Sequence, residues 1–243
     1  MIGIGKNRDR ALKITSKRGK FCNNLKNNNN NMHYIYLHGF ASSPQSTKAQ
    51  YIRDRLAERN IPLHILDLNQ GDFSHLTITR QLQQARQAFP LDNTPVTLIG
   101  SSLGGLTAAY LAAESPQVKR LVCLAPAFDF LSHWLPQIGD VQMQQWQTSG
   151  YLSVYHYGEK RLLPLHYQFV LDAKQYDSTS LKTPVPTLIL HGKEDGVIPI
   201  QASENYASSR DWVQFTPLQS DHALANALPE VWQYITNFCQ IGC

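Results

Sequence analysis

The chain has 243 residues, of which 42% are hydrophobic and 16% are charged, and its formal net charge is +4 at pH 7. This composition excludes a mostly disordered chain and a coiled coil, and the length suits one large α/β domain. The sequence lacks both a run of about eighteen apolar residues and an apolar stretch after its basic N-terminus. We therefore expect neither a membrane-spanning helix nor a secretory signal peptide.

The positive charge is concentrated at the N-terminus. Residues 1–31 contain eight of the 22 lysines and arginines and one of the 18 acidic residues, so the rest of the chain has 14 bases and 17 acids. This balance gives no support to nucleic-acid binding. Residues 1–31 end in five asparagines and have few large apolar side chains, which predicts a disordered basic extension. Either Met32 is the true start of the protein, as its position before the first strand-like run favours, or the extension is a genuine basic tail.

The four cysteines, Cys22, Cys123, Cys239 and Cys243, are scattered along the sequence. They form neither a CxxC pair nor the Cys/His spacing of a zinc site. We therefore expect a reduced, cytoplasmic protein without a metal site.

From residue 33 onward, apolar strand-like runs alternate with segments whose apolar residues recur at helical spacing. The expected strands are residues 33–37, 63–66, 96–99, 121–125, 187–190 and 212–215. The expected helices are residues 46–59, 78–89, 103–114 and 230–239. Strands that alternate with helices predict βαβ units and a mainly parallel sheet with helices on both faces.

Residues 127–182 interrupt this alternation with a segment that is rich in aromatic residues and has only weak strand signals. We interpret the segment as a cap inserted over a pocket. The alternative is that its aromatic side chains only pack the insertion onto the sheet. Residues 32–243 are accordingly expected to form a single domain with one cap insertion.

The strongest chemical signal is the G-x-S-x-G pattern of residues 100–104, with Ser102 at its centre. It follows an expected strand and opens an expected helix, which is the setting that this motif requires. A serine on such a turn exposes its hydroxyl, and the helix N-terminus favours a developing negative charge nearby. We therefore predict that Ser102 is a nucleophile rather than part of a plain Gly/Ser turn.

A serine hydroxyl needs a base to take its proton, and His222 is the best candidate among nine histidines. It lies in the polar loop 219–223, between the last expected strand and the last expected helix. His38 and His191 each end an expected strand just before a glycine, and we expect structural roles for them.

The base in turn needs an acid that fixes its tautomer and stabilises its charged form. Asp195 lies at the tip of the turn that follows the strand at residues 187–190, and it is the predicted acid. The adjacent Glu194 is the alternative.

An oxyanion hole needs backbone N–H groups near the developing charge. The first is expected from Leu103, the residue after the nucleophile. The second is expected from the loop after the first strand, with Phe40 preferred and Ala41 next.

Four segments occur in an order that resembles the α/β-hydrolase superfamily: residues 38–44, 100–105, 192–199 and 221–223. More narrowly, the sequence HGFASSP beside GSSLGG is similar to the small bacterial YqiA/YcfP-type esterases, and the resemblance spans residues 33–239. It implies an α/β-hydrolase fold and a carboxylic-ester hydrolase that uses no cofactor and acts on a small-molecule ester. Two alternatives remain: a thioesterase or amide hydrolase with the same triad, and a non-catalytic binding protein on this fold. The natural substrate and the oligomeric state stay open.

Overall fold

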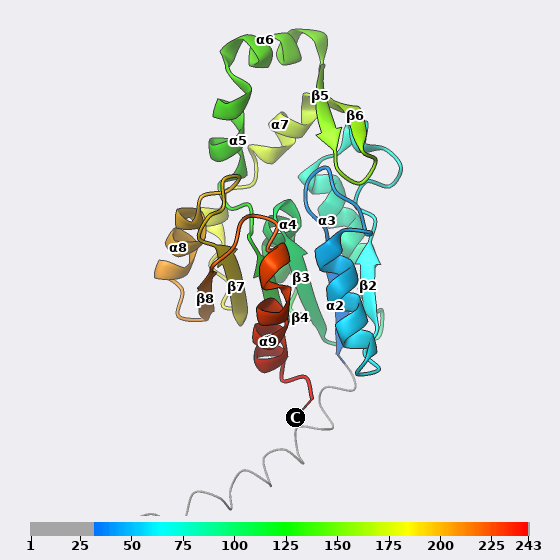
Figure 1. Cartoon of the computed structure of the whole chain (residues 1–243). Coiled ribbons are helices and arrows are strands. Elements are labelled where there is room, and N and C mark those ends of the chain that lie inside the picture. Colours follow the sequence, from blue (N-terminus) through cyan, green and yellow to red (C-terminus); the bar gives the residue numbers. More distant parts are fainter. Residues whose placement is uncertain (1–31, 243) are drawn as a thin grey trace, which may run out of the picture.

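A parallel six-stranded sheet forms the centre of the protein in the computed structural model, which describes residues 32–242 (Figure 1). The disorder expected for residues 1–31 concerns residues outside this range. The strand order is β2-β1-β3-β4-β7-β8. The strands are β1 (His33–Leu37), β2 (Leu63–Leu66), β3 (Val96–Ser101), β4 (Val118–Leu124), β7 (Thr187–Gly192) and β8 (Val213–Leu218). All six expected strands are present, and the predicted parallel sheet is confirmed.

Helices cover both faces of the sheet, as the alternating pattern predicts. Two of them, α2 (Thr47–Ala57) and α9 (Leu228–Cys239), pack against one face (Figure 1). The other face is covered by α3 (Ile78–Gln87), α4 (Leu103–Glu114) and α8 (Ile200–Ser208). Short 3-10 turns occur at η1 (Phe73–His75), η2 (Ser178–Ser180) and η3 (Ala225–Ala227).

Strand β1 illustrates how the sequence builds two cores, one on each face of the sheet. Successive side chains of a strand point to opposite faces. Tyr34 and Tyr36 pack with α2 and α9, whereas Ile35 and Leu37 pack with α3 and α4. All four side chains are almost fully buried. A strand that is buried on both faces reads as a continuous apolar run, which is why it stands out in the sequence.

Helix α3 begins where the sequence supplies a capping side chain. The hydroxyl of Thr77 accepts a hydrogen bond from the backbone N–H of Arg80, which satisfies one of the free donors of the first turn. Ile78, Leu82 and Ala85 recur at helical spacing and are buried against the core. The cap and the apolar stripe together fix where this helix starts and which face it buries.

The segment between β4 and β7 forms a separate layer beyond the carboxyl ends of the strands (Figure 1). It contains α5 (Phe130–Ile138), α6 (Asp140–Ser149), β5 (Tyr151–His156), β6 (Arg161–His166) and α7 (Gln168–Ala173). Strands β5 and β6 pair in an antiparallel hairpin, which we call the cap hairpin. The inserted cap region of the expected fold is thus present, with more strand structure than its sequence signals suggest.

Aromatic side chains join this cap to the loop that follows β1. The ring of Phe40 lies with its centroid 5.1 Å from that of Trp134 and 5.3 Å from that of Phe169. Phe73 and Phe130 complete the cluster at 5.6 and 5.8 Å. The aromatic residues of the insertion therefore do pack it onto the core, and they do so around the loop that carries Phe40.

Candidate active site

Ser102 occupies the turn between β3 and α4 with a backbone conformation that few non-glycine residues adopt. Its φ of 53° and ψ of −122° lie outside the helical and strand regions, so the surrounding structure must hold this conformation. The turn is closely packed: a Cβ on Gly104 would lie only 2.2 Å from the carbonyl oxygen of Leu37. The glycine of the motif therefore lets α4 pack directly on the end of β1 and leaves the Ser102 side chain partly exposed.

The three predicted triad residues meet at the carboxyl ends of β3, β7 and β8. The Oγ atom of Ser102 lies 3.0 Å from Nε2 of His222. On the other side of the imidazole, Nδ1 of His222 lies 2.7 Å from Oδ2 of Asp195. Because a carboxylate only accepts hydrogen bonds, Nδ1 must carry the proton, which leaves Nε2 free to accept from the serine hydroxyl.

The Asp195 carboxylate is fully buried, and hydrogen bonds surround it. Its Oδ1 atom accepts from the backbone N–H groups of Val197 at 2.8 Å and Ile198 at 2.9 Å. Burial raises the pKa of this carboxyl, but the contacts with His191 and His222 outweigh it and hold the pKa well below its usual range. Asp195 is therefore an anion at neutral pH.

Glu194, the alternative acid, lies outside this arrangement. Its side chain is exposed, while its backbone N–H donates to the carbonyl oxygen of Ser220. The structure thus brings Asp195, and not its neighbour, to His222.

His191 has a place in the site that the sequence interpretation missed. Its Nε2 atom lies 2.9 Å from Oδ2 of Asp195, the same oxygen that faces His222. The sequence predicted only a structural role for His191 at the end of its strand, and not this contact with the acid. The available signal was the spacing of four residues between His191 and Asp195. Because the turn after the strand is short, it can bring Asp195 back beside the end of that strand.

The loop that carries His222 is fixed from two sides. The Oδ1 atom of Asp221 accepts from the backbone N–H groups of Ala223 at 2.9 Å and Leu224 at 3.2 Å. The ammonium of Lys48, on α2, donates to the carbonyl oxygen of His222 at 3.1 Å. Burial lowers the pKa of Lys48 to about 8, although the charges of Asp195 and Asp221 oppose this shift.

The loop after β1, residues 38–44, in which the sequence predicts an oxyanion donor, is called the oxyanion loop, and it lies against Ser102. A Cβ on Gly39 would lie 3.1 Å from the Cβ of Ser102, so only a glycine permits this approach without adjustment. Within residues 32–242, no hydrogen bond is made by the backbone N–H of Phe40 or of Leu103. Both groups are thus free to donate to a bound molecule.

His38 supports this loop and stays away from the triad. It is buried, and its Nε2 atom accepts from the backbone N–H of Leu68 at 3.1 Å. Nδ1 therefore carries the proton and donates to the carbonyl oxygen of Gly39 at 2.9 Å. The structural role expected for His38 agrees with these contacts.

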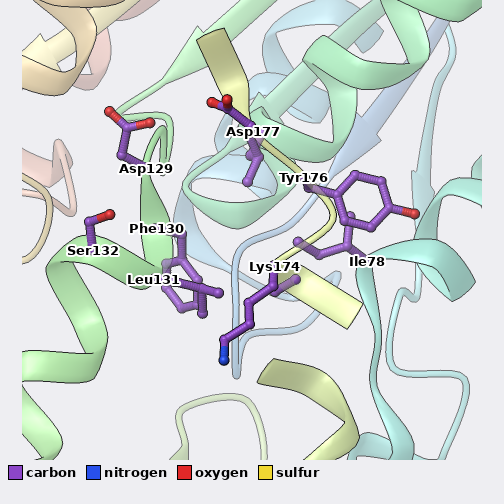
Figure 2. A pocket seen from close by; sticks show the side chains of 10 residues that line it. Ile78, Asp129, Phe130, Leu131, Ser132, Lys174, Tyr176 and Asp177 are labelled. Carbon is purple, nitrogen blue, oxygen red and sulfur yellow. The ribbon is translucent and has the colours of Figure 1, made fainter. Parts of the chain in front are cut away.

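A cavity of about 230 Å³ lies between the cap and the core (Figure 2). Apolar side chains from α3, α4 and α5 and polar side chains around η2 line it, including Ile78, Phe130, Lys174 and Asp177. No residue of the triad lines it. We therefore place the candidate chemistry at the turn between β3 and α4 that carries Ser102, and not in this cavity.

Two features are absent from the described residues. No group of three or more His, Cys, Asp or Glu side chains in residues 32–242 is arranged to hold a metal ion. In the same stretch of the chain, every helix is too short or too polar to cross a membrane.

A family model matches most of the chain. The model describes the uncharacterised protein family UPF0227 and matches residues 33–239, the span over which the sequence resembles YqiA/YcfP-type proteins. No curated protein matches the chain in sequence.

Three solved structures illustrate the similarity in fold. A protein from Agrobacterium vitis S4 described as a hydrolase is 24% identical, with a TM-score of 0.76 over 87% of this chain and 89% of the other. Est1E from Butyrivibrio proteoclasticus, solved with ferulic acid bound, is 20% identical, with a TM-score of 0.69 over 86% and 89%. Mouse alpha/beta hydrolase domain-containing protein 10 is 20% identical, with a TM-score of 0.67 over 84% and 90%. The α/β-hydrolase fold expected from the sequence is confirmed.

Proposed function

The chain belongs to the UPF0227 family, and we propose that it is a serine hydrolase that cleaves carboxylic esters through an acyl-enzyme intermediate. The observation that carries the proposal is the unbroken line of contacts from Ser102 Oγ to His222 and on to Asp195. A nucleophile, a base and an orienting acid within hydrogen-bonding distance form the arrangement that activates a serine. The ferulic acid bound in Est1E, a protein of the same fold, supports a carboxylic acid as one product.

In the first half of the reaction, Ser102 Oγ attacks the acyl carbon of the ester while its proton passes to His222 Nε2. The former carbonyl oxygen becomes an oxyanion, which accepts hydrogen bonds from the backbone N–H groups of Phe40 and Leu103. Asp195 stabilises the imidazolium that forms. The carbon–oxygen bond of the ester then breaks, and the His222 proton goes to the departing alkoxide, which leaves as the alcohol.

In the second half, a water molecule attacks the acyl carbon, and His222 takes a proton from that water. The tetrahedral intermediate collapses and breaks the bond to Ser102 Oγ, which receives the proton back from His222. The free acid departs and the enzyme is restored. Each oxyanion donor contributes a factor of roughly 10²–10³ to the rate of such reactions. We propose a small-molecule ester as substrate and the cytoplasm as location, with no cofactor required.

Hydrolysis of a panel of p-nitrophenyl esters, acyl-CoA thioesters and amides tests the proposal. We expect the wild-type protein to hydrolyse one or more esters, Ser102→Ala to lose that activity and Ser101→Ala to retain it. Ser101 is the matched control because it is the preceding serine, it ends β3, and it is buried away from His222. Thioester or amide turnover without ester turnover would replace the substrate class, and Ser102→Ala turnover at the wild-type rate would overturn the mechanism.

A further inference from the structure

His191 is a fully buried histidine that lies next to the acid of the candidate triad. It lies near the carboxyl end of β7, and its side chain has no exposed surface. Its Nε2 atom lies 2.9 Å from Oδ2 of Asp195 and 3.0 Å from the carbonyl oxygen of Ile198. Its Nδ1 atom lies 2.8 Å from the hydroxyl of Ser203 on α8.

These contacts determine which nitrogen of His191 carries the proton. Two oxygen acceptors lie against Nε2, and neither can donate, so Nε2 must carry a hydrogen. Nδ1 can then accept from Ser203, whose hydroxyl is able to donate. Nε2 carries one hydrogen, which forms a hydrogen bond with the carbonyl oxygen of Ile198, while Oδ2 of Asp195 lies beside the same N–H group. The ring is thus held from both sides.

Asp195 consequently has N–H groups against both of its carboxylate oxygens. Two backbone N–H groups face Oδ1, while His222 and His191 both face Oδ2. A carboxylate surrounded in this way cannot rotate without losing contacts, and in a buried site the loss of such contacts is unfavourable.

We propose that His191 is a positioning residue for the acid of the triad, an inference that rests on the proposed function. Its Nε2–H keeps the Asp195 carboxylate turned so that Oδ2 faces His222 Nδ1. In this orientation Asp195 selects the His222 tautomer that can accept the Ser102 proton. Ser203 acts on Asp195 only indirectly, because its hydroxyl holds the His191 ring in place.

Two substitutions of similar size test the contact between His191 and Asp195, since one removes the N–H group and the other keeps one. Gln at position 191 can place an amide N–H group near the position of Nε2, whereas Met is of similar length and has no N–H group. We expect His191→Met to lower the kcat for ester hydrolysis by about tenfold or more, short of the roughly 10⁴-fold loss expected when the acid itself fails to orient the base. KM should change little, and His191→Gln should recover most of kcat. The fraction of protein that reacts with a fluorophosphonate gives the concentration of folded active sites, to which kcat is referred.

A double-mutant cycle separates positioning from packing. If His191 acts through Asp195, then His191→Met should cost little in an Asp195→Ala background, because the carboxylate that it positions is absent. His38→Met is the matched control, because His38 is also a buried histidine at the end of a strand but has no contact with Asp195. Its effect should add to that of Asp195→Ala.

Equal kcat values for His191→Met and His191→Gln would overturn the proposal, as would full additivity of His191→Met with Asp195→Ala. If His191→Met does not fold, Ser203→Ala supplies the test. It should lower kcat by a smaller factor that also disappears in the Asp195→Ala background, and an unchanged kcat would contradict the proposal. Failure of the underlying function is recognised separately, because the wild type would then hydrolyse no ester or Ser102→Ala would keep its activity.

Discussion

The backbone N–H of Tyr157 donates a hydrogen bond to the carbonyl oxygen of Ala41 at 2.7 Å. This bond joins the turn of the cap hairpin to the oxyanion loop, next to the proposed donor Phe40. The next residue, Gly158, packs so closely that a Cβ there would lie 2.7 Å from the Cβ of Ser43. The cap hairpin therefore contacts the loop that carries a proposed catalytic N–H group and helps to position it.

We predict that Gly158→Ala lowers kcat/KM for ester hydrolysis, because the new methyl group pushes the hairpin turn and the oxyanion loop apart. The loss should reach about 10²-fold if the Phe40 donor is displaced entirely. Steady-state kinetics on a p-nitrophenyl ester would measure it. The double variant Ser43→Gly with Gly158→Ala removes the atoms that clash and should restore the rate. If relief of the clash leaves the rate low, the turn does not act through the oxyanion loop.

Asp195→Asn is predicted to lower kcat by roughly 10⁴-fold, because an amide at this position no longer selects the productive tautomer of His222. Glu194→Gln is its matched control, since it makes the same chemical change on the adjacent, exposed side chain. We expect the control to keep the wild-type kcat. The reverse ranking would assign the acid role to Glu194.

Lys48→Met is predicted to reduce kcat several-fold, because the loop of His222 loses a charged hydrogen bond of a kind that contributes about 1.5–3 kcal/mol. The same substitution should change how stability depends on pH. The pKa of Lys48 is lowered from 10.5 to about 8, so between these pH values the unfolded chain binds more protons than the native one. The contribution of Lys48 to the free energy of unfolding therefore rises with pH across this window.

Urea unfolding of the wild-type protein and Lys48→Met at pH 7.5 and pH 10 measures this linkage. The free energy of unfolding of the wild type, relative to that of the variant, should be larger at pH 10. A difference that stays the same at the two pH values would show that the native Lys48 titrates like the unfolded one.

The sheet and its helices could be predicted because burial on both faces gives long apolar runs that end at polar turns. Helix α8 was missed, since Gln201, Ser203, Glu204 and Asn205 leave too few apolar positions to reveal a helical stripe. The cap hairpin was missed for a related reason. Tyr151 and Tyr155 lie at exposed positions of β5 and His156 at a buried one, so residue polarity does not mark its buried face, and Pro164 interrupts β6.

In the candidate site, the sequence predicted Ser102, Asp195 and His222 because each lies in a motif that a strand end positions. Their assignment as catalytic residues stays a prediction that the geometry supports. Contacts between distant segments left no such signal. Neither the Lys48 bond to the His222 loop nor the Tyr157 bond to Ala41 follows from local spacing, because tertiary packing alone brings those segments together.

The most direct test of the account is to treat the protein with a fluorophosphonate and to locate the adduct by peptide mass spectrometry while ester hydrolysis is followed. Activity should fall in proportion to the fraction modified, with the adduct on Ser102 and none on Ser101. His222→Ala should react far more slowly, because Ser102 has lost the base that takes its proton. A fully active protein that carries the adduct elsewhere, or a His222→Ala variant that reacts as fast as the wild type, would contradict the central claim that Ser102 is a nucleophile activated by His222.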